Sequence, residues 1–271
     1  MVNLAQYNPD DDYSHHKKEF ENAYKIFCPY ENLEKAVVLD LCAGTGLHMG
    51  FLMEKSPAYV YGVDLLDYST LWGGNFKQKI IDVFQSHGIQ IDDKKCQFLT
   101  DNAENLLFKN NFFDFIYCIN AFEHIGNPLE SIIEIWRVLR PGGYAFIQFD
   151  PIYYCDTGSH MFDFLSEPWL HLILPHDEYI QRLRAAQCPP SIIEDFIHGL
   201  NRKPKEYFLN LFTAICSVEM NMFKKIVSYE WSGVQKESHM THPNYFRLLN
   251  HYSHDDLTFR GMNFLLEKRS I

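Results

Sequence analysis

The sequence predicts an α/β protein built on a doubly wound, mainly parallel β-sheet. Three observations lead to this prediction. Apolar segments with strand character alternate with amphipathic helical segments up to residue 150, and such alternation implies right-handed crossovers between parallel strands. The first strand runs directly into a glycine-rich turn, "VVLDLCAGTG". After Asp150 the alternation stops, so a different kind of segment begins there.

The individual elements follow from local patterns. Residues 14–27 predict a helix because apolar residues recur at helical spacing, and Pro29 ends it. Residues 128–143 predict a second helix, with Pro128 at its start and Pro-Gly-Gly at its end. The other elements expected up to residue 150 are strands at 36–41, 58–65, 96–101, 113–120 and 144–150, and helices at 47–53 and 76–88.

The chain is expected to form a single domain with four parts. Residues 1–34 form a helical cap and residues 35–150 a ligand-binding core. Residues 151–215 are rich in Pro, His and aromatic residues, and they are too many for a structureless loop, so we expect a mostly helical lid. Residues 216–271 return to the sheet with strands at 223–231 and 261–269.

Composition limits the possible partners and the compartment. The net charge of -11 disfavours binding to nucleic-acid backbones. No apolar run is long enough to cross a membrane, and no signal peptide is visible at the start of the sequence. The seven cysteines are scattered without a C-x-x-C pair, which favours reduced thiols in a cytoplasmic protein.

Polar and glycine residues gather at the carboxyl ends of the predicted strands, where doubly wound sheets bind ligands. Gly44 and Gly46 allow the backbone to approach a ligand closely. Asp64 follows Gly46 by 18 residues and is suited to accept ribose hydroxyls. Asp101 with Asn102, and Asn120, end the next two strands. This set predicts a nucleoside-like ligand.

The turn does not suit a dinucleotide. A dinucleotide site requires G-x-G-x-x-G, but the third glycine here, Gly50, comes one residue late. Asp40 would also place a negative charge beside a pyrophosphate, whereas a ligand with an ammonium group would tolerate it. A nicotinamide-dependent oxidoreductase is therefore the less favoured alternative.

Residues 35–150 resemble the class I S-adenosylmethionine-dependent methyltransferases, of the methyltransferase type 11 kind. "VVLDLCAGTG" is similar to their first motif, and "VYGVDL" to their acidic second-strand motif. "FLTDNAENLLFKNNFFDFIYCINAFEHI" and "ESIIEIWRVLRPGGYAFIQ" resemble their third to fifth strands. The resemblance implies a seven-stranded sheet with an antiparallel last strand. Cys42-Ala43 departs from the Gly-Cys pair that is common in the family.

The resemblance also implies roles for individual residues. Asp40 and Gly44 would hold the amino-acid part of S-adenosylmethionine, Asp64 its ribose, and Asp101 with Asn102 its adenine. S-adenosylhomocysteine would be the product. Asp114 is interpreted as structural. The remaining predicted cofactor contacts are Cys42, Ala43, Gly46, Leu65, Ala103 and Asn120.

Two histidines are the candidate catalytic residues. His124 follows the fourth strand and His160 follows the fifth, and a neutral imidazole can remove the proton of a hydroxyl acceptor near neutral pH. The candidate acceptor-binding residues in the lid are Tyr153, Tyr154, His160, Phe162, Trp169 and His171. The His and Asp spacings in the lid match no standard metal motif, so no metal is predicted.

The other histidine-rich segments are assigned no chemistry. "SHHKK" at residues 14–18 is interpreted as a solvated helix start, and "ESHMTHPNYF" with "NHYSHDD" as a surface connection. The helix that follows "SHHKK" is expected to close over the cofactor, so that Tyr7 and Tyr13 reach the site.

The predicted function is methyl transfer from S-adenosylmethionine to a small, apolar or aromatic-bearing molecule, with oxygen as the preferred acceptor atom. Besides the oxidoreductase, one alternative is a non-catalytic protein that binds the cofactor as a sensor or partner subunit. The sequence does not determine the oligomeric state.

Overall fold

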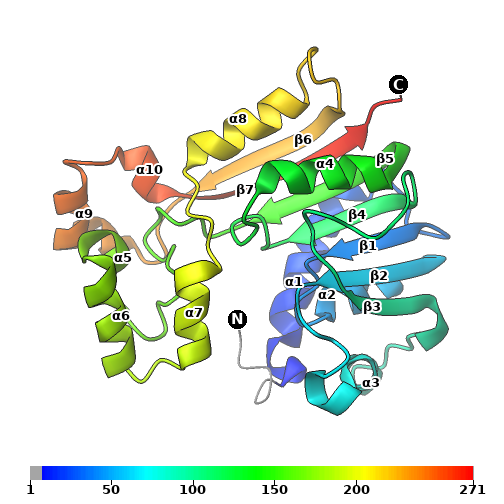
Figure 1. The fold of residues 1–271 in the computed structure, drawn as a ribbon, viewed down its shortest axis with the longest axis horizontal. Helices are drawn as coiled ribbons and strands as arrows, with labels where there is room; N and C mark the ends of the chain where they lie inside the picture. Colours follow the sequence, from blue (N-terminus) through cyan, green and yellow to red (C-terminus); the bar gives the residue numbers. More distant parts are fainter. Residues whose placement is uncertain (1–7, 271) are drawn as a thin grey trace.

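The structure, a computed structural model, describes residues 8–270 and is centred on one seven-stranded sheet (Figure 1). The strand order is β3-β2-β1-β4-β5-β7-β6. β1 to β5 are parallel, whereas β7 runs antiparallel to both of its neighbours, β5 and β6. The predicted fold, with its antiparallel last strand, is confirmed. The strands are β1 (Val37–Leu41), β2 (Tyr59–Asp64), β3 (Cys96–Thr100), β4 (Phe113–Ile119), β5 (Leu139–Phe149), β6 (Phe223–Ser232) and β7 (Phe259–Lys268).

Helices cover both faces of the sheet and bury an apolar core on each side. α1 (Pro9–Phe27), α2 (Leu47–Met53) and α3 (Phe76–Ser86) pack on one face. α4 (Pro128–Val138) and α8 (Lys205–Ile215) pack on the other. Alternate residues of β4 serve the two cores: Phe115 and Tyr117 face the α1 side, while Ile116 and Cys118 face the α4 side.

Two boundaries differ from those predicted. α1 begins at Pro9 rather than at residue 14, because the side chain of Asn8 caps it and three acidic residues favour its first turn. β5 begins at Leu139, directly after α4, because Leu139 already pairs with Phe113. The Pro-Gly-Gly segment therefore lies inside β5, at an irregularity where the pairing with β4 passes from Leu139 to Tyr144.

Short helices form a lobe beyond the carboxyl ends of the parallel strands (Figure 1). α5 (Leu170–Ile173), α6 (His176–Ala185) and α7 (Pro190–His198) come from the predicted lid. The short helix η3 (Glu237–Thr241), α9 (Pro243–Leu248) and α10 (His254–Thr258) come from later in the chain. The lobe has two apolar clusters of its own, while α8 packs against the sheet.

The late histidine segments were wrongly predicted to be a plain surface connection. His239 is buried, and its Nδ1 lies 2.7 Å from Oδ2 of the buried Asp156. Arg260 at the start of β7 donates to the other oxygen of Asp156 at 2.9 Å. His254 Nδ1 lies 2.7 Å from the hydroxyl of Tyr245. These contacts join the two parts of the lobe to each other and to the sheet.

Asp114 has the structural role predicted for it. Its carboxylate accepts a hydrogen bond from the backbone amide of Val37 at 2.7 Å and from the guanidinium of Arg140. The side chain thus links β4 to the starts of β1 and β5. Within residues 8–270, no helix is both long and apolar enough to cross a bilayer.

Candidate functional site

The glycine turn between β1 and α2 has a left-handed backbone shape that is held in place by its neighbours. Gly44 has φ +49° and Gly46 has φ +78°, both in the left-handed region that favours glycine. The buried Tyr68 donates its hydroxyl to the carbonyl of Gly44 at 2.9 Å. A Cβ on Gly44 would meet nothing closer than 4.0 Å, so this residue leaves open space for a ligand.

Gly46 also has a packing role that was not predicted. A Cβ there would lie 2.6 Å from the ring of Phe98, so the hydrogen side chain makes room for an aromatic residue of β3. The late Gly50 is required for packing too, since a Cβ there would lie 2.1 Å from the ring of Phe84 on α3. Of the three glycines, Gly44 has the most open surroundings.

Two buried oxygens beside the turn have no hydrogen-bond partner in the described part of the chain. They are Oδ2 of Asp40, at the end of β1, and Oδ1 of Asn120, just after β4. Unpaired buried acceptors are costly, and a donor from a ligand would relieve that cost. Burial and the nearby Asp64 raise the pKa of the Asp40 carboxyl well above its usual value. An ammonium group is a donor that would suit either oxygen.

The second predicted contact, Asp64, is already positioned by the backbone. Its carboxylate accepts the amides of Gly44 at 2.9 Å and Leu66 at 3.1 Å, one on each oxygen. A carboxylate has about four lone-pair positions, so it can still accept two ribose hydroxyls. Burial raises the pKa of Asp64 despite these bonds. Leu65 is 72% exposed and thus available to cover a flat ligand.

The third group of predicted contacts forms the loop after β3. Asp101 accepts the amides of Asn102 and Leu107, each at 2.9 Å. Asn102 is exposed, and its side-chain oxygen accepts the amide of Glu104. Ala103 is buried, with its carbonyl bonded to Ser131. Asp101 and Asn102 therefore shape the loop, while their remaining lone pairs and the amide group of Asn102 can reach a base. Cys42 and Ala43 lie in the glycine turn itself.

The structure brings the two predicted catalytic histidines together. The rings of His124 and His160 are 5.0 Å apart between centroids and nearly perpendicular, at 89°. His124 Nδ1 lies 2.8 Å from the carbonyl of Gly199, and His160 Nε2 lies 2.9 Å from the carbonyl of Pro151. Each ring therefore donates one N–H to the backbone and leaves its other nitrogen free as an acceptor.

Both imidazoles are neutral near pH 7. The protein atoms around His124 lower its pKa by desolvation, although part of the side chain remains accessible to solvent. Burial and the neighbouring His124 lower the pKa of His160 to about 3. His124 is thus the better proton acceptor of the two, because His160 is too weakly basic to hold a proton.

Glu123 completes this cluster and was missed in the sequence analysis. Its side chain is 3% exposed, and neither carboxyl oxygen has a hydrogen-bond partner within residues 8–270. One possible metal-ligating atom from each of Glu123, His124 and His160 lies within 4.8 Å of the other two. Burial raises the pKa of Glu123 well above its usual value. Glu123 directly precedes His124 in "FEHI", so the sequence placed it beside the candidate base, but only the histidine was assigned a role.

Replacing Glu123 with glutamine is expected to stabilise the protein at pH 8. The raised pKa means that the folded state holds a proton that the unfolded chain releases, so Glu123 costs stability increasingly as pH rises above its ordinary value. The expected gain is about 1 kcal/mol at pH 8, or about 2–4 °C in Tm, and none at pH 4. Thermal unfolding at both pH values measures it. Exposed Glu167→Gln is the control, and an equal gain at pH 4 and pH 8 would contradict the explanation.

The predicted acceptor-binding residues occupy two different environments. Tyr153, Tyr154 and Phe162 are partly exposed, and Arg202 lies over the ring of Tyr153 at 5.3 Å. Trp169, in contrast, is fully buried and donates its indole N–H to the carbonyl of Leu257. His171 is buried with Nε2 2.7 Å from the carbonyl of Tyr153, and burial lowers its pKa to about 4. In this conformation Trp169 and His171 form the interior of the lobe and present no surface to an acceptor.

The N-terminal helix differs from the prediction. Tyr7 lies outside the described residues. Tyr13 is buried and stacks on His87, with ring centroids 3.6 Å apart, so it packs α1 against α3 rather than reaching the site. Glu19 does reach the site, since its Oε1 accepts a hydrogen bond from Asn120 at 2.8 Å. His16 and His48 flank the same carboxylate, so "SHHKK" is not merely solvated.

Comparison with known proteins finds a methyltransferase domain over the strands described above. The family model described as "Methyltransferase domain" matches residues 39–147. A tRNA U34 carboxymethyltransferase from Campylobacter curvus is 23% identical over 64% of this chain and 53% of its own length. A mitochondrial ubiquinone biosynthesis O-methyltransferase from Dictyostelium discoideum is 27% identical over 45% of this chain and 36% of its own length. The chain thus spans about half, or less, of the length of these relatives.

A solved structure supports the fold over nearly the whole chain. YcgJ from Bacillus subtilis superposes with a TM-score of 0.51 at 18% identity, covering 93% of this chain and 99% of its own. The domain match favours the S-adenosylmethionine interpretation over the nicotinamide alternative. Residues 39–147 of the chain therefore match a methyltransferase domain, within a fold that YcgJ shares over nearly the whole chain.

Proposed function

We propose that this protein transfers a methyl group from S-adenosylmethionine to a hydroxyl oxygen of a small, apolar or aromatic-bearing molecule. The observation that carries the proposal is the pairing of His124 with His160. Two neutral imidazoles, each fixed by a backbone carbonyl, lie where the fourth and fifth strands end. That edge of the sheet also holds Asp40, Asp64 and Asn120, so a base would stand beside the cofactor.

The chemistry requires alignment and removal of one proton. S-adenosylmethionine, when bound, supplies an electrophilic sulfonium methyl group. His124 would take the proton of the acceptor hydroxyl at its free Nε2 as the oxygen bonds to the methyl carbon and the carbon–sulfur bond breaks, which leaves S-adenosylhomocysteine. His160 packs edge-on against the ring of His124 and helps to position it. Asp40 and Asn120 receive the ammonium group, and Asp64 receives the ribose hydroxyls.

A small acceptor suits the surroundings of this site. The lobe lies over the carboxyl ends of the strands, and Asn201 ties it to the β4 loop by donating to the carbonyls of Phe122 and Ile125. The net charge of -11 would repel an RNA backbone. One relative modifies tRNA by name, so RNA is the class of acceptor to test against. The seven free cysteines accord with a cytoplasmic enzyme.

Titration with S-adenosylhomocysteine tests the cofactor part of the proposal. Wild-type protein should bind one equivalent, and Asp64→Asn should bind about tenfold more weakly, because the amide weakens hydrogen bonds from the ribose hydroxyls by about 1.4 kcal/mol. Asp67→Asn is the matched control, since Asp67 is an exposed acid three residues after Asp64 and accepts a hydrogen bond from the amide of Ser69. Equal affinities of wild type and Asp64→Asn would contradict the assigned role.

Turnover tests the acceptor part. Purified protein is incubated with S-adenosylmethionine and a panel of phenols, catechols, aromatic amines and carboxylic acids, or with total tRNA, and S-adenosylhomocysteine is measured by mass spectrometry. We expect product with hydroxyl compounds and none with tRNA. Product only with tRNA would overturn the small-molecule assignment. Cofactor binding without product from any class would favour the sensor alternative.

A further inference from the structure

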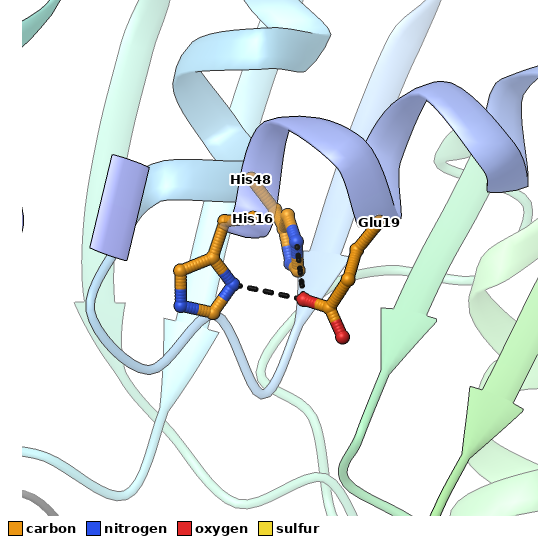
Figure 2. Close-up of side chains that lie close together, drawn as sticks. All are labelled: His16, Glu19 and His48. Carbon is orange, nitrogen blue, oxygen red and sulfur yellow. Dashed lines mark hydrogen bonds and ion pairs between the residues drawn. The ribbon is translucent and has the colours of Figure 1, made fainter. Parts of the chain in front are cut away.

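Three donor side chains from two helices converge above the glycine turn. His16 and Glu19 lie one helical turn apart on α1, and His48 lies near the start of α2, which follows the turn directly. Figure 2 shows both imidazoles directed at one carboxylate oxygen of Glu19. This cluster is separate from Glu123, His124 and His160, and the proposed methyl-transfer chemistry makes no use of its imidazoles.

The spacing of the donors fits a single metal ion. Glu19 Oε2 lies 3.0 Å from His16 Nδ1 and 3.5 Å from His48 Nε2. Around a tetrahedral Zn²⁺ with bonds of about 2.0–2.1 Å, neighbouring ligand atoms are about 3.3 Å apart. The two imidazole rings are 4.9 Å apart between centroids and perpendicular, at 88°. Two imidazoles bound to one such ion would place their centroids about 5 Å apart.

The hydrogen bonding and the exposure of these three side chains also suit a cation. Asn120 occupies Oε1 of Glu19, which leaves Oε2 to face the two rings. His48 Nε2 is buried without a hydrogen bond in the described region. The side chains of His16, Glu19 and His48 are 24%, 16% and 13% exposed, which leaves an entry path from solvent.

We propose that His16, Glu19 and His48 form a binding site for one divalent transition-metal ion, with Zn²⁺ as the expected occupant. Imidazole and carboxylate donors suit Zn²⁺ and its neighbours in the first transition series, and they suit Mg²⁺ or Ca²⁺ poorly. With three protein ligands the fourth position would hold water. The ion would fasten α1 to the start of α2 and, through the Glu19 contact with Asn120, to the end of β4.

Zinc titration of untagged, chelator-treated protein tests the site. Calorimetry should show one Zn²⁺ bound per wild-type chain, and bound Co²⁺ should give the visible absorption of a low-coordinate site. His16→Ala and His48→Ala should each weaken Zn²⁺ at least about 100-fold, since even outer partners of ligands contribute about 10–100-fold. Zn²⁺ should also raise Tm in wild type and in neither variant.

Two further variants make the test specific. His87→Ala is the matched control, because His87 pairs with Asp10 of α1 at 3.0 Å without a third donor. Glu123→Gln removes a donor from the second cluster. Both should bind Zn²⁺ like wild type. Far-ultraviolet circular dichroism and S-adenosylhomocysteine binding establish folding.

Three results would overturn the proposal: no Zn²⁺ bound by folded wild type, undiminished binding by His16→Ala and His48→Ala, or binding lost in Glu123→Gln. In the first case the cluster would be an ordinary hydrogen-bonded contact between helices. None of these results would bear on the methyltransferase proposal, which is tested by cofactor binding and turnover.

Discussion

Alanine in place of His124 is expected to slow methyl transfer at least about 100-fold, the lower end of the range for loss of a general base. The affinity for S-adenosylhomocysteine should be unchanged, because His124 makes its contacts with Gly199 and His160 rather than with the glycine turn. The measurement is kcat and kcat/KM with the best hydroxyl compound found in the panel, together with a calorimetric titration of the same sample.

The pH dependence separates a base from a residue that only packs. His124 must be neutral to accept a proton, and burial lowers its pKa below the ordinary histidine value, so the wild-type rate should be flat from pH 7 to 8 and fall only at acidic pH. Without the imidazole, the His124→Ala rate should rise about tenfold per pH unit until the acceptor itself ionises. Parallel pH profiles for the two proteins would show that His124 only packs.

His160 offers an internal comparison. Its pKa near 3 makes it a weak proton acceptor, so His160→Ala should lower kcat through the position of His124 and keep the wild-type shape of the pH profile. If the pH profile changed in His160→Ala but not in His124→Ala, His160 would be the base and His124 the positioning residue.

The sequence could place the candidate cofactor contacts at one edge of the sheet because their determinants are local. The glycine turn, Asp64 and Asp101 each follow a short apolar strand, and parallel strands bring their carboxyl ends to one edge whatever the rest of the chain does. The sequence could also place His124 and His160 after adjacent strands. It could not show that their rings meet, because His160 is 36 residues further on and enters through a left-handed turn.

The missed residues depend on how separate segments pack. Glu19 reaches Asn120 only because α1 lies across the sheet, 101 residues away in sequence. Asp156 and His239 meet over 83 residues to build the lobe, so neither segment alone signalled this buried hydrogen bond. Trp169 was read as a ligand contact because aromatic residues surround it in the sequence, whereas it fills the interior of the lobe beside Tyr245. Composition cannot separate these two uses of an aromatic residue.

Asparagine in place of Asp40 is expected to stabilise the cofactor-free protein and weaken cofactor binding. Asp40 is 2% exposed, with Oδ2 unpaired among the described residues and the Asp64 carboxylate nearby. Its raised pKa means that the side chain costs stability at any pH above the ordinary aspartate value. An amide removes that cost, so Tm at pH 7 should rise by about 2 °C or more, for a gain of about 1 kcal/mol.

The same substitution should lower the affinity for S-adenosylhomocysteine at least about 30-fold, because removing one partner of a buried charge pair costs about 2 kcal/mol or more. Wild-type affinity should increase with pH, since the Asp40 carboxyl gives up its proton to receive the ammonium group, and Asp40→Asn should lose this dependence. Thermal unfolding without ligand and calorimetry at pH 6, 7 and 8 measure both effects. A variant that is less stable than wild type, yet binds equally well at every pH, would place Asp40 in the fold and not in the cofactor site. The opposing signs of the two effects are the distinctive result. Replacing a residue that stabilises the fold lowers the stability of the protein, whereas replacing a binding residue that destabilises the fold raises it.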